Sequence, residues 1–365
     1  MISDTSRRSR PRIAVVGTVG IPANYGGFET LVENLTLHAA KHGLPCDVEV
    51  YCTATAYPSR PERHNGARLL YLPIKANGVW SVPYDILSLL WASWRRSDAI
   101  LVLGVSGAIA LPIVKLLSRA KLVVNIDGLE WKRAKWAPAP AAFLRWCEKV
   151  AVRFGDVIVA DNQGIVDHVS QSYGRDAVDI AYGGDHASAA STLPAADMLG
   201  GDYALMLCRI EPENNVEMIL EAFADVPGRR LVAVGNWSNS EHGRQLHKRF
   251  GNTPNITLSD PIYEAGALYR VRSCCSQYIH GHSAGGTNPS LVEMMSLGTP
   301  VLAFDCVYNR YTTEGKAAYF TDKKGLAQLL GEPVRSACGA EMAEIAMRRY
   351  TWDEIGRRYF ELLLD

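Results

Sequence analysis

The chain has 365 residues, of which 48% are hydrophobic and 21% are charged. This length predicts about two domains, and the composition is that of an ordinary globular protein. Basic and acidic residues both number 38, so the formal net charge is zero. A dedicated nucleic-acid-binding protein, which would carry a basic excess, is therefore not expected.

The first residues of the chain are basic, with Arg7, Arg8, Arg10 and Arg12 close together. We expect residues 1–11 to form a disordered tail, with attraction to anionic lipid head groups as the alternative. The tail lacks the apolar run of a secretory signal, and no apolar stretch is long enough to span a bilayer. The eight cysteines show neither a CxxC pair nor zinc-ligand spacing, which indicates a reducing cytoplasm and no structural metal.

Apolar β-branched runs alternate with amphipathic segments of helical length along the chain. In the first half we predict strands at residues 12–17, 47–52, 68–72, 99–103, 121–125 and 156–160. A loop to residue 27 is followed by a helix to about residue 42, and a second helix covers 83–96. In the second half we predict strands at 203–208, 230–234, 256–258, 277–280 and 301–304, and helices at 215–223 and 351–363. Runs that are apolar on both faces are typical of central parallel strands, so the fold class is α/β with crossover helices.

The composition shifts to glycine, alanine, serine and proline between residues 182 and 202, which predicts an interdomain linker. We expect one Rossmann-like, doubly wound domain over residues 1–190, a second over 191–350, and a terminal helix over 351–365. Two such domains in tandem form a cleft between the carboxyl ends of their strands, where ligands bind. The strand-to-helix loops are therefore the places to look for a site.

The loop after the first predicted strand contains Gly26 and Gly27 ahead of a helix. Glycines let backbone amides approach a ligand closely, and a helix N-terminus favours anions. The spacing is not the dinucleotide fingerprint, and no acidic residue ends the second predicted strand to hold a ribose. A phosphate-binding loop and a purely structural turn are both open here.

Arg209 opens the C-terminal half, just after a predicted strand and ahead of a helix, with Asn214 close behind it. A guanidinium at this place can make paired hydrogen bonds to phosphate oxygens and offset the charge of a leaving diphosphate. The alternative is an ordinary surface arginine.

A glycine-rich segment leads from a predicted strand into the helix that bears Glu293. Backbone amides of the segment can hold phosphate, and the carboxylate can accept hydrogen bonds from both hydroxyls of a ribose. The alternative for Glu293 is a first-turn charge favoured by the helix dipole. The residues assigned to nucleotide contacts here are His280, Gly285, Gly286, Thr287, Asn288 and Glu293.

These segments together resemble the retaining glycosyltransferases of family four, which have the GT-B architecture. Residues 291–293 (Leu-Val-Glu) with 298–301 (Gly-Thr-Pro-Val) resemble the donor-nucleotide site, and residues 208–215 resemble the diphosphate-binding segment. Residues 26–29 resemble the N-terminal glycine loop, and the helix after Tyr350-Thr351-Trp352 resembles the family's return helix to the N-terminal domain.

A narrower resemblance concerns a bacterial subfamily that includes rhamnosyltransferases of capsule and cell-wall polysaccharide assembly. It rests on residues 17–30, 127–133, 182–186 and 280–290, and the overall resemblance extends from residue 12 to residue 363. The motifs are specific for the fold and the reaction class, and much less so for the sugar.

The sequence departs from the family pattern at two positions. The first of the family's paired glutamates, which normally touches the donor sugar, is Gly285 here, and the usual phosphate-binding lysine is Asn214. Arg209 must then carry more of the phosphate charge, with help from the amides of Gly26 and Gly27. The missing glutamate is compatible with a 6-deoxy donor, and TDP-rhamnose is our best interpretation.

The resemblance implies retention of anomeric configuration, a site that needs no metal or other cofactor, and a saccharide acceptor bound by the N-terminal domain. We place Asp127 and Glu130 near this acceptor, where Asp127 would orient or deprotonate the acceptor hydroxyl; loop capping is its alternative role. The expected catalytic residues are thus Asp127, Arg209 and Glu293.

Two segments of the N-terminal half suit a membrane interface. Residues 86–96 are apolar with tryptophans and a basic end, and residues 131–136 are basic and aromatic. A buried core helix is the alternative for the first. We expect a cytoplasmic protein at the inner face of the membrane, with an acceptor linked to a polyprenyl diphosphate. The rival functions are a nucleotide-sugar epimerase of the same architecture and a non-catalytic sugar-nucleotide-binding subunit.

Overall fold

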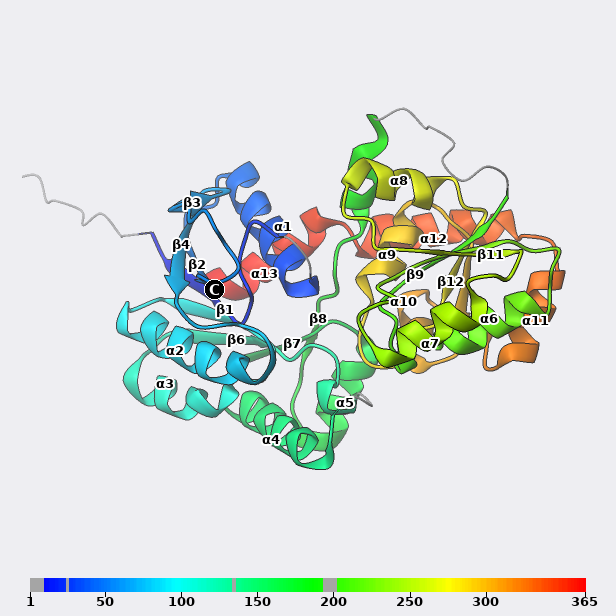
Figure 1. The fold of residues 1–365 in the computed structure, drawn as a ribbon. Helices are drawn as coiled ribbons and strands as arrows, with labels where there is room; N and C mark the ends of the chain where they lie inside the picture. Colours follow the sequence, from blue (N-terminus) through cyan, green and yellow to red (C-terminus); the bar gives the residue numbers. More distant parts are fainter. Residues whose placement is uncertain (1–9, 24–25, 133–135, 193–201) are drawn as a thin grey trace, which may run out of the picture.

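Two sheets, each covered by helices on both faces, organise the chain (Figure 1). The computed structural model describes residues 10–23, 26–132, 136–192 and 202–365. Most of the expected N-terminal tail and part of the expected linker lie outside the described residues.

The N-terminal sheet has, among the described residues, eight strands in the order β3-β4-β2-β1-β5-β6-β7-β8. Their bounds are β1 (Arg12–Val16), β2 (Asp47–Thr53), β3 (Arg63–His64), β4 (Ala67–Leu72), β5 (Ala99–Leu103), β6 (Lys121–Asn125), β7 (Val157–Ala160) and β8 (Val178–Asp179). Neighbouring strands pair in parallel, except that β3 and β4 are antiparallel. The strand order reverses between β1 and β5, so the loops after these two strands flank a crevice at the sheet's carboxyl edge.

Both faces of this sheet are buried because alternate side chains of one strand enter different cores. Ile13 and Val15 of β1 pack with the helices α1 and α13, whereas Ala14 and Val16 pack with α2, α3 and α4. This burial explains why the strands are continuously apolar in sequence. The helices are α1 (Gly27–His42), α2 (Ser81–Trp94), α3 (Leu111–Leu117), α4 (Pro138–Phe154), α5 (Gln163–Tyr173) and α13 (Trp352–Leu364).

The C-terminal sheet has six strands, all parallel, in the order β11-β10-β9-β12-β13-β14 within the described part of the chain. Their bounds are β9 (Ala204–Leu207), β10 (Leu231–Val234), β11 (Ile256–Ser259), β12 (Gln277–His280), β13 (Val301–Phe304) and β14 (Ala318–Phe320). Its order reverses between β9 and β12. The surrounding helices are α6 (Val216–Ala224), α7 (Glu241–Phe250), α8 (Ala265–Ser273), α9 (Pro289–Ser296), α10 (Val307–Thr312), α11 (Lys323–Gly331) and α12 (Ser336–Arg349).

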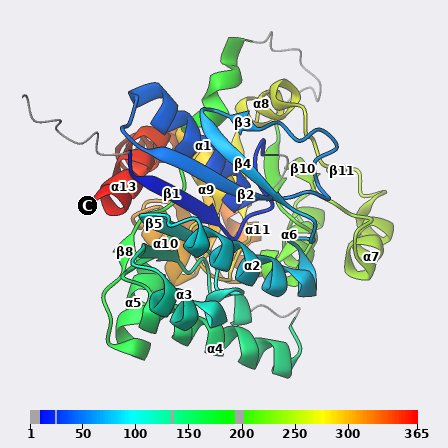
Figure 2. The same cartoon turned by 90° about the vertical axis from the view of Figure 1, so that its left-hand side faces the viewer.

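The last helix, α13, leaves the C-terminal sheet and packs against α1, β5 and β6 of the N-terminal sheet. Figure 2 shows α13 beside α1. Between the sheets, a 3-10 segment (Asp185–Thr192) contacts α8 and α9, so this stretch of the expected linker is docked on the C-terminal half. Within the described residues, no helix combines the length and the apolar character that crossing a bilayer requires.

Candidate active site

The strand order of the C-terminal sheet brings two of the predicted segments together. The loop after β9 carries Arg209 and Asn214, and the loop after β12 carries residues 281–288; these strands are neighbours at the point where the order reverses. Ligands of doubly wound sheets bind at such a point. The two loops are also joined directly, because the Ser283 backbone amide donates to the Glu213 carbonyl oxygen over 2.9 Å.

Arg209 and Asn214 differ in how they are held. The Arg209 side chain is 43% exposed and its Nη1 lies 3.6 Å from a carboxylate oxygen of Glu211, so the guanidinium reaches solvent. Asn214 is buried: its side-chain amide donates to the Arg209 carbonyl oxygen over 2.7 Å, and its Oδ1 lies 2.7 Å from Nδ1 of His282. Asn214, at the lysine position of the resembled family, therefore fixes the loop backbone, and Arg209 is the cation presented by this loop.

The loop after β12 leads into α9, whose first residues have the usual capping pattern of a helix N-terminus. Asn288 is the N-cap of α9, and its side chain accepts a hydrogen bond from the Ser290 amide, while Pro289 occupies the first turn. Gly285 and Gly286 both have positive φ, at 55° and 70°, which a side chain at these positions would strain. The glycine pair thus sets the path by which the chain enters the helix.

Gly285 also lies in contact with the N-terminal half. A Cβ built on Gly285 would lie 2.9 Å from the backbone nitrogen of Leu129, and one built on Gly128 would lie 3.2 Å from the Gly285 carbonyl carbon. The position at which the resembled family carries its first glutamate is therefore closed by the loop after β6. A glutamate side chain does not fit there in this arrangement of the two halves.

Glu293 lies on α9 and is 8% exposed. Its carboxylate is paired with Nη2 of the buried Arg272 at the end of α8, and its other oxygen lies 3.1 Å from Nε2 of His186. The Trp352 indole donates to Nδ1 of His186 over 2.9 Å, which leaves the His186 proton on Nε2. Burial alone would raise the pKa of Glu293, but Arg272 and His186 outweigh it and hold the pKa below its ordinary value.

The segment Tyr182-Gly183-Gly184-Asp185-His186 positions this network. A Cβ on Gly184 would lie 2.3 Å from the Val292 carbonyl oxygen, and one on Gly183 would lie 2.5 Å from the Trp352 ring. The Asp185 carboxylate accepts a hydrogen bond from the Trp352 amide over 2.8 Å at the start of α13. The glycines therefore allow the segment to pass close to both α9 and α13, where His186 reaches Glu293.

His280, at the end of β12, is 3% exposed, and its Nε2 finds no hydrogen-bond partner among the described residues. Burial and the neighbouring His282 ring, 6.1 Å away, lower the pKa of His280 to about 3. The imidazole is therefore neutral at ordinary pH, and His280 adds no positive charge to a phosphate site.

On the N-terminal side, Asp127 follows β6 with a left-handed backbone (φ 60°), and its amide donates to the Asn125 side chain over 2.9 Å. Asn125 in turn donates to the Tyr359 hydroxyl of α13 over 2.7 Å. Asp127 thus lies at the carboxyl edge of the N-terminal sheet, beside the Gly128–Gly285 contact. Glu130, in the next turn, accepts from the Trp136 indole over 3.3 Å.

A second acid, Asp161, lies at the carboxyl end of the neighbouring strand β7. It is 3% exposed, and its Oδ1 has no hydrogen-bond partner within the described ranges. Burial, with Asp127 and Asp179 nearby, raises the pKa of Asp161 well above its ordinary value. A Cβ on Gly286 would lie 2.5 Å from the Asp161 carboxyl, and Asn162 donates to the Thr287 hydroxyl over 3.1 Å. This pair therefore contacts the glycine loop from the opposite half.

The first glycine loop is closed by its own helix. The Glu29 carboxylate of α1 accepts from the Thr18 hydroxyl over 3.0 Å and from the Val19 amide over 2.8 Å. Gly26 has φ 128°, and a Cβ there would meet the Glu29 carboxylate at 1.9 Å. Gly27 begins α1 and faces the Tyr182 hydroxyl. Gly26 is therefore required for this turn, whatever else the loop binds.

The structure thus brings most of the predicted residues to two facing edges. Arg209, Asn214, His280, Thr287 and Glu293 lie on the C-terminal side, and Asp127 lies opposite, at the Gly128–Gly285 contact. The sequence interpretation did not single out His186, Arg272, Asp161, Asn162 or His282. His186 and His282 gave a signal, as members of motifs used for the resemblance; the others needed the topology.

Comparison with protein families divides the chain into two parts. Residues 11–185 match a family model described as a domain of unknown function (DUF1972), and residues 199–340 match the model of group 1 glycosyl transferases. Among curated proteins, no match was found.

Solved structures share the fold over the whole chain at low sequence identity. Sucrose-phosphate synthase from Thermosynechococcus elongatus is 16% identical with a TM-score of 0.76, and the match covers 97% of this chain and 98% of that one. HepE from Anabaena, solved with UDP and glucose, is 15% identical with a TM-score of 0.68, covering 97% and 99%. A UDP-N-acetylglucosamine 2-epimerase from Listeria monocytogenes is 15% identical with a TM-score of 0.64, covering 96% and 95%. These likenesses establish the GT-B fold, and the group 1 match over residues 199–340 supports a glycosyltransferase.

Proposed function

We propose that the protein transfers a sugar from a nucleoside-diphosphate donor, with TDP-rhamnose as the best candidate, to a saccharide acceptor with retention of configuration. The proposal rests on one observation above all: Arg209 and the glycine loop that leads to Glu293 flank the strand-order reversal of the C-terminal sheet. The group 1 domain and the UDP in the Anabaena structure support a nucleotide at this place.

In this mechanism the anomeric carbon loses its bond to the diphosphate and gains one to the acceptor oxygen. The Arg209 guanidinium offsets the negative charge that develops on the leaving diphosphate, with backbone amides of the glycine loop as further donors. Glu293 keeps unused lone pairs beside its bonds to Arg272 and His186, because a carboxylate has about four acceptor sites, and it accepts the ribose hydroxyls. Asp127 orients the acceptor hydroxyl and takes its proton.

The donor-sugar preference follows from Gly285. With no glutamate at this position and the backbone of Leu129 in its place, the site offers no carboxylate there to bind sugar hydroxyls. A 6-deoxy sugar, which has one hydroxyl fewer to satisfy, suits such a site. This is the reason to prefer rhamnose over a hexose with all its hydroxyls.

The test begins with melting temperatures of the purified chain against UDP, GDP, ADP and TDP and their sugars. A ligand that binds the native state raises its stability by RT ln(1 + [L]/Kd), so the true donor gives the largest shift. Transfer to saccharide acceptors is then followed with that donor, and the anomeric configuration of the product is read by NMR. Inversion of configuration, or no nucleotide-sugar shift at all, would contradict the proposal.

The same assay separates the rival functions. An epimerase, which the Listeria likeness brings into consideration, would change the donor sugar without an acceptor. A non-catalytic binding subunit would give the melting shift with neither transfer nor epimerisation. Product profiles with and without acceptor distinguish the three outcomes.

We also propose that the protein is cytoplasmic and that the N-terminal half binds the membrane surface to reach a polyprenyl-diphosphate-linked acceptor. The supporting feature is an apolar patch of exposed side chains on α2, α3, α4 and the 3-10 turn Gly78–Trp80 before α2, which are elements in contact with one another. Its residues are Val79, Trp80, Leu87, Trp94, Ile113, Leu116, Leu117, Phe143 and Trp146. Exposed basic residues on the same elements and their connecting loops are Arg96, Arg119, Arg145, Lys149 and Arg153. Apolar and basic side chains in this combination suit anionic lipid.

Residues 86–96, most of which belong to α2, have both buried and exposed side chains. One face of α2 is in the core, with Leu89 and Ala92 buried, while Leu87 and Trp94 are exposed. Trp131, from the second expected segment, donates its indole proton to Glu148, and residues 133–135 lie outside the described residues. Sedimentation with anionic vesicles at low salt tests the patch: Leu116→Ser with Leu117→Ser should reduce binding, and unchanged binding would contradict it.

A further inference from the structure

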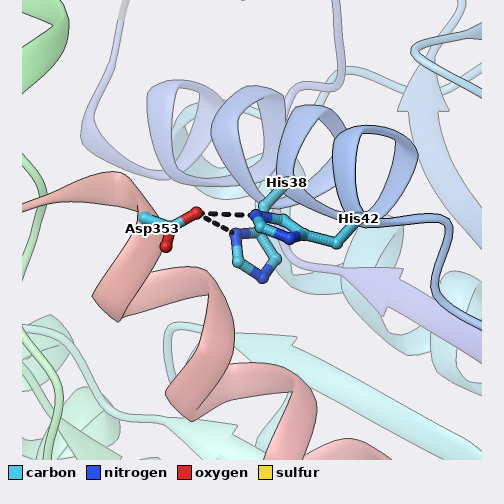
Figure 3. Close-up of side chains that lie close together, drawn as sticks. All are labelled: His38, His42 and Asp353. Carbon is cyan, nitrogen blue, oxygen red and sulfur yellow. Dashed lines mark hydrogen bonds and ion pairs between the residues drawn. The ribbon is translucent and has the colours of Figure 1, made fainter.

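Two histidines and an aspartate meet where the last helix crosses to the N-terminal half, away from the glycine loops. His38 and His42 lie four residues apart on α1, which places both rings on one face of the helix. Asp353, in the first turn of α13, points toward them (Figure 3). Nε2 of His42 lies 2.7 Å from Asp353 Oδ1, and Nδ1 of His38 lies 3.5 Å from the same oxygen.

The two helices approach closely because residue 356 is glycine: a Cβ there would lie 2.4 Å from Cγ of His38. His38 is 8% exposed and stacks on Phe360 at a centroid distance of 6.0 Å, so its ring is fixed. The side chains of His42 and Asp353 are 39% and 59% exposed, so both can move. One ligand is thus rigid and two are adjustable.

We propose that His38, His42 and Asp353 bind a divalent transition-metal ion of the zinc class, which joins α13 to α1. One potential ligand atom from each residue lies within 4.8 Å of the other two. Ligands of a tetrahedral zinc ion stand about 3.3 Å apart, given bonds of about 2.0–2.1 Å, so small movements of His42 and Asp353 complete the set. Two imidazoles and a carboxylate suit zinc, and water takes the fourth position.

Asp353 supplies a carboxylate to the cluster, and one basic side chain lies close to it. Lys41, whose Nζ lies 3.6 Å from Asp353 Oδ1, would compete with a metal ion for this carboxylate. Its side chain is 72% exposed, so the ammonium group can move away into solvent when a metal ion binds. On binding, the His42 proton moves to Nδ1 and Nε2 turns to the metal.

The experiment uses the full chain, stripped of metal with EDTA and titrated with ZnCl2 by calorimetry. We expect one zinc ion per chain. His42→Gln and Asp353→Asn each keep a hydrogen-bonding group but lose a ligand. Each should weaken zinc binding by more than about tenfold, since even outer partners of a metal site are worth about 10–100-fold.

His64→Gln is the matched control. His64 also contacts a carboxylate of α1, with Nε2 2.7 Å from Glu33 Oε1, but in the described part of the chain no second histidine joins this pair in a group of potential metal ligands. Its zinc affinity should equal that of the wild type. Absence of zinc binding by the wild type would overturn the proposal. So would equal losses in His64→Gln and His42→Gln, or wild-type affinity in both ligand variants.

A second measurement tests whether the metal joins the two helices. Zinc should slow amide hydrogen exchange across residues 352–364 in the wild type and leave it unchanged in Asp353→Asn, with circular dichroism confirming that each variant is folded. Zinc binding without protection of α13 would overturn the bridge. These experiments use no nucleotide or acceptor, so they stand or fall independently of the proposed transferase activity.

Discussion

The glycine loops at residues 17–29 and 281–293 give the same sequence signal, a glycine-rich turn followed by a helix with a glutamate, but their glutamates do different things. Glu29 accepts hydrogen bonds from Thr18 and Val19 of its own loop, so its carboxylate closes a turn. Glu293 is held by Arg272 and His186, which come from other elements. Glu29 therefore stabilises its own turn, whereas Glu293 joins three separate elements beside the candidate site.

The largest expected effect concerns the Arg272–Glu293 pair. Arg272→Met leaves a buried carboxylate without its main cation, which should cost about 3–5 kcal/mol in the free energy of unfolding. Glu29→Gln keeps the size and one acceptor of its side chain and should cost about 1–3 kcal/mol. Urea unfolding of both variants measures the difference. If Arg272→Met costs no more than Glu29→Gln, the contrast between the two loops is wrong.

The second-largest expected effect is on the affinity for nucleoside diphosphates. Glu293→Gln loses the charge that strengthens bonds to the ribose hydroxyls, so nucleoside-diphosphate binding should weaken roughly ten- to a hundredfold. The effect should be at the low end for TDP, whose deoxyribose offers only the 3′ hydroxyl.

Calorimetric titration with UDP and TDP measures this effect, and Glu217→Gln is the control. Glu217 is a half-exposed carboxylate of α6 that pairs with Arg249 at 2.5 Å. It has no part in the proposed nucleotide site. Equal affinities of wild type and Glu293→Gln for both nucleotides would make Glu293 a structural residue like Glu29.

Arg209→Ala should lower transfer at least about tenfold while the fold survives. The residue is exposed, so its removal leaves no buried group unpaired, and the buried Asn214 supplies no charge in its place. Transfer rate and circular dichroism are measured together. Arg244→Ala, which removes an exposed arginine paired with Glu241 on α7, should leave the rate unchanged. Near-wild-type turnover of Arg209→Ala would remove Arg209 from the site.

Secondary structure could be predicted from the sequence more fully than the contacts of the site residues. The continuous apolar strands and the crossover helices are local patterns, so β1, β5, β6 and α1 begin and end within a residue of the prediction. Shorter or less apolar elements, such as β8, β14 and α10, have too weak a pattern to be separated from loops. Two doubly wound α/β domains were therefore predictable from these patterns, and the GT-B architecture was predictable from the family resemblance.

The partners of the site residues were not predictable in the same way. Arg272 precedes Glu293 by 21 positions and sits at the end of an ordinary helix, and Asp161 shares no motif with Gly286. Such pairs arise only once the sheets and the contact between the halves are built. The closing of position 285 by Leu129 is also a contact between halves, so the sequence could show the missing glutamate but not what takes its place.

The smallest expected effect is a pH dependence that comes from His280, the last residue of β12 before the second loop. The pKa of His280 is lowered to about 3 in the folded state by burial and His282, against an ordinary value of 6.5. Between these values the unfolded chain binds the extra proton, so the stability from neutral His280 is fully present above pH 6.5 and is lost as the pH falls below it. By about pH 5 the loss should be on the order of 1–2 kcal/mol.

His280→Phe keeps a ring without the titrating group, so its free energy of unfolding should fall less than that of the wild type between about pH 7.5 and about pH 5. Urea unfolding at the two pH values measures this, and equal losses in both proteins would mean that the fold does not lower the pKa of His280.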